Sequence, residues 1–483
     1  MTRTGCVRSL CVLMLMPVIA AAQFPEDALR LSSPGMGVGA RALGMGNATI
    51  GIASDFSAIA WNPAGLAQLR YGEFALGMTY QSLSDESTFL GNVSQYTSGS
   101  TTLNMLGVAL PVPVRQGSFV VAFGYHRQND FTAGTSFTGF NPTASYIQTW
   151  SPDGRPYGSD LSGNLAYQLY LSDIDTVSGR WISPIRDRVR QTATVLEDGG
   201  LDNWSVAGAA EVAKNLYLGA TVSYVSGSYA YDRVYEESDE QQVYETFPYD
   251  FDRLRVNERI DAEVSGWYAR FGFLYNALDL LRVGVSVKTP TGYHVREEFT
   301  TEGRSFFDNG DVQLPDGPFR LPGRGEYDVT TPWVFGLGAS LTLGPVIVAA
   351  DGEFTDWSTM KFSNAVTEVE ALNRDIRDIF HPAVNLRLGA ELRLWFFHPR
   401  AGLIYNMSPY REDDSSPTDF FERTFDQKYA TVGAGLLLSG SVMVDVAYAY
   451  GWWKTYRMND LGTSRTDEAV DTHSVNFALR VRF

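Results

Sequence analysis

The stretch Val384–Leu392 (VNLRLGAEL) decides the fold of this 483-residue chain. Every second residue of it is apolar, and the residues between are polar, charged or glycine. The last ten residues repeat this pattern and end on the aromatic Phe483. A period of two over such a length predicts a long strand with two different faces. Strands of about 9–11 residues, apolar outside and polar inside, suit a tilted crossing of a bilayer.

The rest of the chain predicts an all-β, up-and-down antiparallel barrel of about 14 strands that spans a membrane. Short and long connections alternate along the chain, which is the plan of an outer-membrane barrel with both termini at the short-turn rim. A tight turn is expected at His398-Pro399. The expected strands are 71–81, 102–112, 117–127, 202–213, 215–227, 262–276, 280–289, 330–343, 345–356, 383–397, 399–408, 427–439, 441–453 and 472–483.

The first residues read as a secretory signal. Residues 1–22 combine Arg3 and Arg8, an apolar core and an Ala-rich cleavage site before Gln23. Both cysteines lie in this segment, so the mature chain is expected to have no disulfide and no thiolate ligand. The apolar run is too short for a spanning helix, and no long charge-free run follows it. The net charge of −17 argues against nucleic acid as a partner.

The segment 23–70 is predicted to form a compact hatch, or plug, ahead of the barrel of residues 71–483. It is rich in Gly and Ala, and small residues permit tight packing of short helical turns in a confined space. Its Asn62-Pro63-Ala64 marks a turn.

Asn62-Pro63-Ala64, Asp356-Trp357-Ser358 and Arg482-Phe483 carry a resemblance to the FadL/TodX/OmpP1 family of outer-membrane transport proteins. The resemblance covers nearly the whole mature chain. It implies a monomeric barrel in the bacterial outer membrane that takes up hydrophobic molecules passively, with long-chain fatty acids as the best-known substrate. Loops would capture the solute, the lumen would bind it, and a hatch movement or a gap in the wall would release it. The alternative is a PorV-like component of a secretion system that binds and shuttles proteins.

The resemblance also implies where substrate binds, since this family's Asn-Pro-Ala motif lies close to its internal hydrophobic site. The residues expected to line that site are Phe56, Ile59, Trp61, Asn62, Pro63, Ala64 and Leu66. The alternative is a hatch turn packed against the wall.

Charged residues of the strands fall on the lumen face by alternation, because Arg or Lys facing lipid would cost roughly 2–4 kcal/mol near the midplane. They are expected either to brace the wall or to meet a substrate carboxylate, for which Arg387 and Arg393 are the candidates.

No enzyme is expected. None of the five histidines lies near a G-x-S-x-G pattern or in metal-ligand spacing, so no catalytic residue, metal or cofactor is predicted. Two large loops, Gln128–Leu201 and Tyr229–Ile260, offer aromatic surface for capture or for packing as a cap. Asn364–Phe380 shows helical spacing and is expected to form a short loop helix. The expected partners are a hydrophobic solute and the lipid and lipopolysaccharide of the outer membrane.

Overall fold

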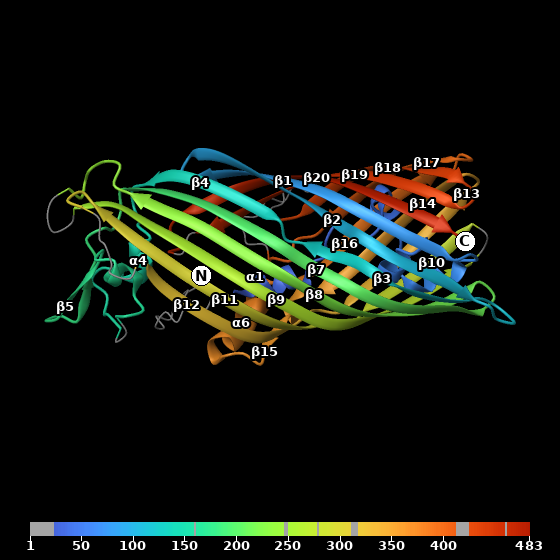
Figure 1. The fold of residues 1–483 in the computed structure, drawn as a ribbon, viewed down its shortest axis with the longest axis horizontal. Helices are drawn as coiled ribbons and strands as arrows, with labels where there is room; N and C mark the ends of the chain where they lie inside the picture. Colours follow the sequence, from blue (N-terminus) through green and yellow to red (C-terminus); the bar gives the residue numbers. More distant parts are fainter. Residues whose placement is uncertain are drawn as a thin grey trace, which may run out of the picture.

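The computed structural model is a closed barrel of fourteen antiparallel strands (Figure 1). It describes residues 24–158, 161–245, 250–277, 280–310, 317–411, 425–458 and 461–483, so the expected signal segment lies outside it. The main sheet holds eighteen segments. Three pairs of segments continue one another (β3/β4, β10/β11 and β12/β13), and β15 is a three-residue piece beside them, which leaves fourteen strands and confirms the predicted number.

The strands of the barrel vary widely in length. Their bounds are β1 (Glu73–Phe89), β2 (Asn92–Val112), β3 (Phe119–Asp130), β4 (Ala133–Asn141), β7 (Val189–Ala213), β8 (Leu216–Ser238), β9 (Phe251–Asn276), β10 (Leu281–Lys288), β11 (Gly292–Phe307), β12 (Phe319–Thr330), β13 (Val334–Leu343), β14 (Val346–Asp356), β15 (Lys361–Ser363), β16 (Pro382–Leu392), β17 (Phe397–Asn406), β18 (Gln427–Ser439), β19 (Val442–Met458) and β20 (Arg465–Arg482).

Closure comes from the pairing of the first strand with the last. β1 pairs with β2 on one side and with β20 on the other, in a register that sets Glu73 opposite Arg482. Every named strand pair in the barrel is antiparallel. A closed sheet has no unpaired edge, which is the condition for strands to cross lipid.

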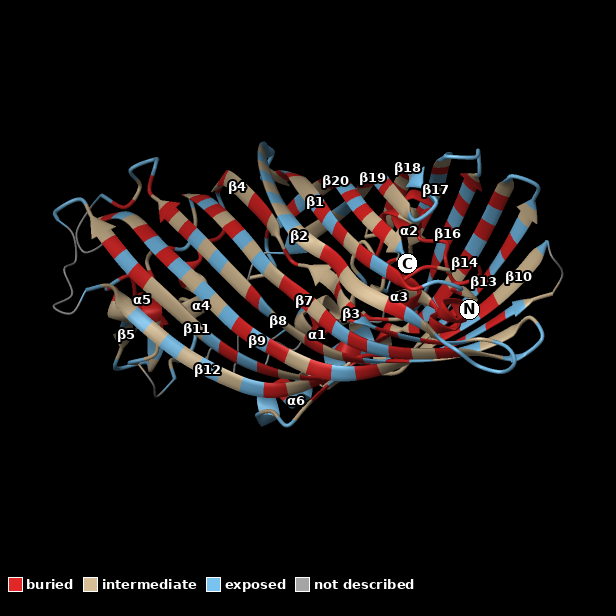
Figure 2. Ribbon diagram, turned by 45° about the vertical axis from the view of Figure 1, so that its right-hand side comes forward, coloured by how far each residue is buried: buried red, intermediate tan, exposed pale blue. Residues whose placement is uncertain are grey.

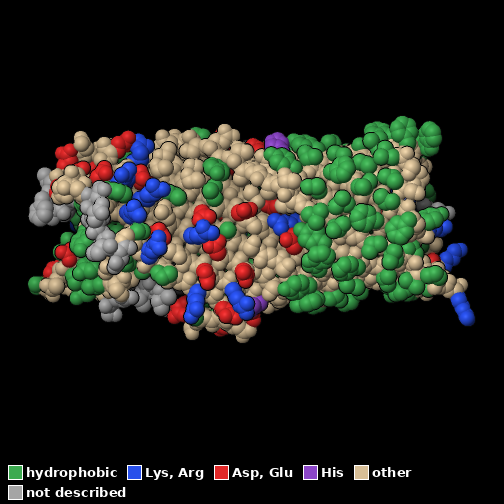
Figure 3. All heavy atoms as spheres, viewed as in Figure 1, with side chains coloured by type: hydrophobic (Ala, Val, Ile, Leu, Met, Phe, Trp, Pro, Cys, Tyr) green, Lys and Arg blue, Asp and Glu red, His purple; other side chains and the backbone are tan. Residues whose placement is uncertain are grey.

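The outer surface carries an apolar belt at the short-turn end. Figure 3 shows hydrophobic side chains gathered there, with charged side chains on the other half of the molecule. On β16, Leu386 and Leu388 are exposed, whereas Asn385 and Arg387 are buried, which confirms the predicted alternation. Figure 2 shows the same alternation of buried and exposed residues along neighbouring strands. The belt is therefore the face that meets lipid, and the charges of β16 face inward.

The strands run far beyond the predicted ends at the loop end. β7, β8 and β9 have 25, 23 and 26 residues. They contain most of Tyr229–Ile260 and the last part of Gln128–Leu201, the two segments expected to be loops. Beyond the belt both strand faces carry polar residues, so the period of two that identified the lipid-facing part is lost. The long loop predicted after strand one was wrong for this reason, because only residues 90–91 join β1 to β2. The loops predicted after strands three and five are shorter than expected for the same reason.

The predicted turn at His398-Pro399 is also wrong. β16 ends at Leu392 and β17 begins at Phe397, so the turn spans 393–396. Trp395 lies at its tip and is 89% exposed. Pro399 lies beyond the last pair of β16 with β17, so its missing N–H leaves no bond to β16 unmade.

The other elements are short, and several fill the barrel. They are α1 (Pro25–Ser32), α2 (Ala40–Gly44), α3 (Ala58–Trp61), η1 (Pro63–Gln68), α4 (Ile147–Trp150), α5 (Leu165–Gln168), β5 (Asp173–Asp175), β6 (Arg180–Ile182), η2 (Trp357–Thr359) and α6 (Thr367–Ile379), of which α6 confirms the predicted loop helix. α2 packs on β17–β20 and η1 on β3 and β7–β9, so the N-terminal segment lies between opposite walls. No described helix has both the length and the apolar character that crossing a membrane requires.

A charge placed on the belt tests its assignment to lipid. We expect Leu388→Arg to lower the free energy of unfolding in lipid vesicles by roughly 2–4 kcal/mol, because Leu388 lies in the middle of β16 and faces outward. Denaturant titration monitored by tryptophan fluorescence measures the change. Val234→Arg, on the outer surface of β8 beyond the belt, should cost far less. Equal costs at the two positions would contradict the assignment.

Candidate functional site

The N-terminal segment, residues 24–70, is called the hatch from here on. Its Asn-Pro-Ala turn anchors it to the wall. The Asn62 side chain is fully buried and donates to the carbonyl oxygens of Ile50 at 2.8 Å and Phe273 at 3.1 Å. Its Oδ1 accepts from the Ala64 N–H at 3.2 Å and so caps η1. A Cβ at Gly219 of β8 would lie 2.4 Å from the Pro63 carbonyl carbon, so only glycine lets the turn approach this closely.

The aromatic and aliphatic residues beside this turn pack against small residues of the wall. The Phe56 ring covers Gly107 of β2, where a Cβ would lie 2.1 Å from the ring. Ile59 and Leu66 are buried in the same core cluster, whose wall members are mostly alanines. Small wall residues facing large hatch residues produce a dry interface that fixes the position of the hatch.

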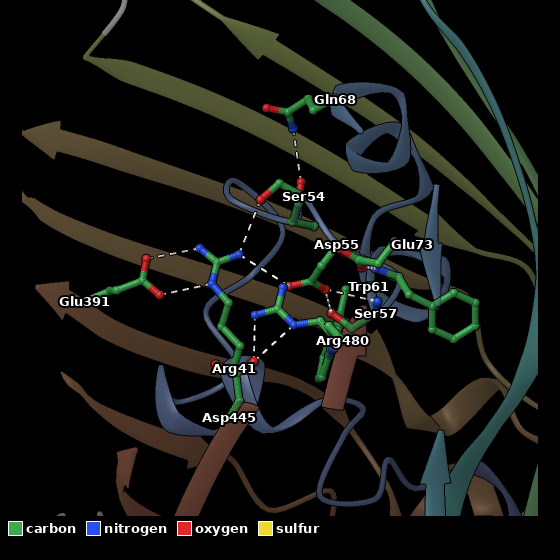
Figure 4. Close-up of polar contacts among 12 residues, drawn as sticks. Arg41, Ser54, Asp55, Ser57, Trp61, Gln68, Glu73, Glu391, Asp445 and Arg480 are labelled. Carbon is green, nitrogen blue, oxygen red and sulfur yellow. Dashed lines mark hydrogen bonds and ion pairs between the residues drawn. The ribbon is translucent and has the colours of Figure 1, made fainter. Parts of the chain in front are cut away.

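Ion pairs join the hatch to the wall at the short-turn end (Figure 4). We call this set the hatch–wall network: Arg41 and Asp55 of the hatch with Glu391, Arg400, Asp445 and Arg480 of the wall. All six side chains are no more than 11% exposed. Each hatch charge therefore has a wall partner of opposite sign in a region from which water is largely excluded.

The distances within the network are those of strong charge-assisted hydrogen bonds. Arg41 Nε lies 3.0 Å from a Glu391 oxygen, and Arg480 Nη1 lies 3.1 Å from Asp55 Oδ2. Asp445 accepts from both Arg400 and Arg480 at 2.6 Å. Burial opposes ionisation of Asp55, but Arg480 and then Arg41 hold the pKa of its carboxyl at about 2, below the ordinary 3.8.

Two adjoining cavities lie in the lumen, on the side of the hatch that faces away from the short-turn end. The larger holds about 230 Å³ and the smaller about 100 Å³, and both are lined by Ser33–Gly35, Arg127, Gln128 and Arg387. Trp61 of α3 and Tyr268 of β9 add aromatic surface to the smaller one. A cavity with aromatic walls and a few convergent polar groups is the usual form of a small-molecule site.

The smaller lumen cavity carries an excess of positive charge. Arg127, Arg270, Lys288 and Arg387 line it, against the single carboxylate of Glu353. Arg127 is paired with Asp130 and Asp202, which do not line the cavity. Arg387 pairs with Glu353 at 3.2 Å, and its guanidinium lies 5.2 Å from the Trp61 ring centre. Apart from Arg127, three basic side chains therefore share one carboxylate, and two of them have no counter-charge among the residues that line this cavity.

The side wall of the larger lumen cavity is interrupted. Pairing between β2 and β3 ends at Met105 opposite His126, and the chain bends between β3 and β4. The N-terminal segment fills part of the bend, where the Gly35 N–H donates to the Gln128 carbonyl at 3.2 Å. The described wall therefore has a local gap in strand pairing beside the cavity.

The predicted site residues separate into three places. Trp61 and Arg387 come together at the smaller lumen cavity. Arg393 lies instead at the short-turn end, bound to Glu391 at 2.8 Å. The others lie in the hatch–wall interface and line neither lumen cavity, and their role toward substrate stays a prediction: Phe56, Ile59, Asn62, Pro63, Ala64 and Leu66.

Sequence reasoning did not predict that the first part of the hatch and the β3–β4 bend help to form the larger lumen cavity. Ser33–Gly37 lines the larger cavity, although nothing in its composition separates it from the rest of the hatch. The polar run Gln128-Asn129-Asp130 does break the alternation of β3, and this is the signal that could have located the bend. A group of His, Cys, Asp or Glu side chains able to hold a metal is not found among the described residues.

A further cavity of about 170 Å³ lies at the loop end. Its walls combine aromatic rings, including Phe89, Phe137 and Tyr235, with Arg233 and Arg457. It lies beyond the apolar belt, between the extended parts of β1, β4, β7 and β8 and the ends of β19 and β20.

Comparison with known proteins shows what the fold is similar to. Neither the family models nor the curated protein sequences contain a match to this chain. Among solved structures, similar ones are the Pseudomonas putida toluene transporter TodX, a Pseudomonas aeruginosa FadL homologue and the Ralstonia pickettii toluene transporter TbuX. Their identities are 13%, 13% and 14%, and their TM-scores are 0.55, 0.56 and 0.51. The matches cover 92%, 92% and 94% of this chain and 99%, 98% and 100% of theirs.

Removal of one hatch charge should loosen the hatch. Loss of one partner from a buried ion pair costs roughly 3–5 kcal/mol, so we expect Asp55→Asn to leave the barrel folded and to speed amide exchange in residues 40–68 at least tenfold. Hydrogen exchange with mass spectrometry measures this, and single-channel conductance should rise with it. Asp467→Asn, which removes a carboxylate from the exposed pair with Arg465, is the matched control. Unchanged exchange in Asp55→Asn would contradict a closing role.

The ion pair of Asp55 with Arg480 also predicts how conductance depends on pH. The pKa of Asp55 is lowered to about 2 from its ordinary value of 3.8. The ionised carboxylate therefore stabilises the closed hatch fully above pH 3.8, and this stabilisation is lost as the pH falls from 3.8 toward 2. We expect constant conductance from pH 8 to 4 and a rise between pH 4 and 2, measured in planar bilayers. The Asp55→Asn variant should show the raised conductance at every pH from 8 to 2. A transition centred near pH 6 would assign the dependence to another group.

Proposed function

We propose that this protein is an outer-membrane channel for the passive uptake of hydrophobic small molecules that carry an acidic head group, long-chain fatty acids first among them. The observation that carries the proposal is the smaller lumen cavity, where Arg270, Lys288 and Arg387 face a single carboxylate beside Trp61. The similar fold of hydrophobic-compound transporters supports the channel part. The apolar belt supports a location in the outer membrane.

The charge of the cavity favours an acid over a neutral hydrocarbon. A carboxylate would form charge-assisted, bidentate hydrogen bonds with Arg387 and relieve the repulsion among the three cations. The aromatic surfaces of Trp61 and Tyr268 would pack on the apolar part of the solute. A neutral aromatic hydrocarbon would leave two of those three cations without an anion, so we rank it as the second candidate substrate.

The proposed route has three stages. The solute first meets the aromatic cavity at the loop end, which lies outside the apolar belt. It then binds in the lumen cavities above the hatch. We place its release at the β3–β4 bend, where pairing with β2 stops beside the larger cavity, while the hatch–wall network keeps the hatch closed.

Uptake measurements with a matched pair of substrates test the proposal. We expect the full-length protein to restore growth on oleate in a strain that lacks its own transporter. Arg387→Gln should reduce oleate uptake about tenfold, because a hydrogen bond to a charged group is worth roughly 1.5–3 kcal/mol. Entry of toluene, which has no charge, should not change in this variant.

Arg296→Gln is the control for this experiment, since Arg296 is exposed on β11 and lines none of the cavities described above. Failure of the wild-type protein to restore growth, together with no fatty acid bound to the purified protein, would remove the fatty-acid assignment. A stable protein partner in pull-downs with an empty lumen would favour the PorV-like alternative.

A further inference from the structure

A separate cavity opens at the short-turn end, on the opposite side of the hatch from the lumen cavities. It holds about 450 Å³ and lies between the hatch residues Arg41, Ser54 and Gln68 and the strand ends of the wall. Its charged lining is almost wholly basic and comprises Arg41, Arg70, Arg282, Arg393, Arg400, Arg480, Arg482 and the single acid Glu391. This composition contrasts with the net charge of −17 of the whole chain.

The carboxylates near this cavity are too few for its arginines. Seven arginines line it, and the carboxylates that pair with them are those of Glu391, Asp445, Asp55 and Glu73, so seven minus four leaves three positive charges. Glu391 alone is shared by three arginines, at 2.7 Å from Arg400, 2.8 Å from Arg393 and 3.0 Å from Arg41. The acids are thus already engaged, and the excess cannot be neutralised by rearranging them.

Two observations locate the missing counter-charge. Arg282 is only partly exposed and has no ion pair within the described part of the chain, and the charges that act on it most strongly are those of Arg393 and Arg41, which have the same sign. Separately, Nη2 of Arg400 is buried and has no hydrogen-bond partner. Glu211, an acid near the end of β7, accepts from the Asn215 N–H and does not line the cavity. Like charges held together in a partly dry site require an anion.

We propose that the short-turn cavity binds a phosphate group. Three excess charges suit a phosphate better than a single carboxylate, and guanidinium forks match phosphate oxygens in pairs. Ser54 and Gln68 on the hatch side add uncharged donors at the cavity wall. The site is independent of what passes through the lumen, because no residue of it lines the lumen cavities.

The phosphate could belong to a lipid head group or to a soluble molecule. The turn after β16 presents Leu394, Trp395 and Phe396 to the outside, next to Arg393 and His398 of the cavity. Exposed aromatic residues beside basic ones are typical of the bilayer interface, where phospholipid head groups lie. Both sources offer the same chemistry to the arginines.

Binding to the full-length folded protein, in two arms, tests the proposal. The first arm titrates inorganic phosphate into protein in a phosphate-free maltoside detergent by calorimetry. The second uses native mass spectrometry to count phospholipids retained from nanodiscs of phosphatidylcholine with or without phosphatidylglycerol. We expect saturable binding in at least one arm, and a loss of about tenfold or more in Arg282→Gln. Arg115→Gln removes an exposed arginine of the β2–β3 turn outside the cavity and should bind as the wild type does.

The pattern across the arms identifies the source. Binding of inorganic phosphate assigns a soluble ligand, and selective retention of phosphatidylglycerol alone assigns a lipid head group. If Arg282→Gln does not fold, Arg393→Gln, whose side chain is 43% exposed, serves instead. Absence of saturable binding in both arms, or an equal loss in Arg115→Gln, would overturn the proposal.

Discussion

A strand that faces lipid can satisfy its backbone only through its neighbours, and the architecture follows from that constraint. The pairing of β1 with β20 removes the last free edge of the belt. Closure in turn creates a lumen that side chains must fill or line. The inward positions therefore carry residues such as Asp351 and Arg387, which a lipid-facing wall could not tolerate.

Buried lumen charges need partners, and the hatch supplies some of them. Arg41 and Asp55 give Glu391 and Arg480 a further partner of opposite sign, while the Ile50 N–H donates to Asp351 at 2.8 Å. The interior is consequently divided into regions of different character. Glycine and alanine contacts hold the hatch in place, ion pairs fix its short-turn side, and the lumen side leaves cationic groups accessible to a ligand.

Alternation identified the strands where one face meets lipid and failed where both faces meet water. The β16 residues Leu386 and Arg387 were placed on the correct faces because their environments differ sharply. The outer halves of β8 and β9 were taken for loops because no such difference exists there. For the site, Trp61 and Arg387 were within reach of sequence reasoning. Their neighbour Lys288 was covered only by the general expectation that charged strand residues face the lumen, since which inward residues converge depends on barrel closure.

The unequal strand lengths give the molecule a height that its bilayer portion does not need. β9 has 26 residues, which at about 3.3 Å each span roughly 85 Å, or about 65 Å of vertical rise at a tilt near 40°. A bilayer accounts for about 25 Å of that rise. The remainder stands clear of the hydrocarbon, so under the proposed function a poorly soluble molecule would enter the protein well above the membrane surface and descend within it.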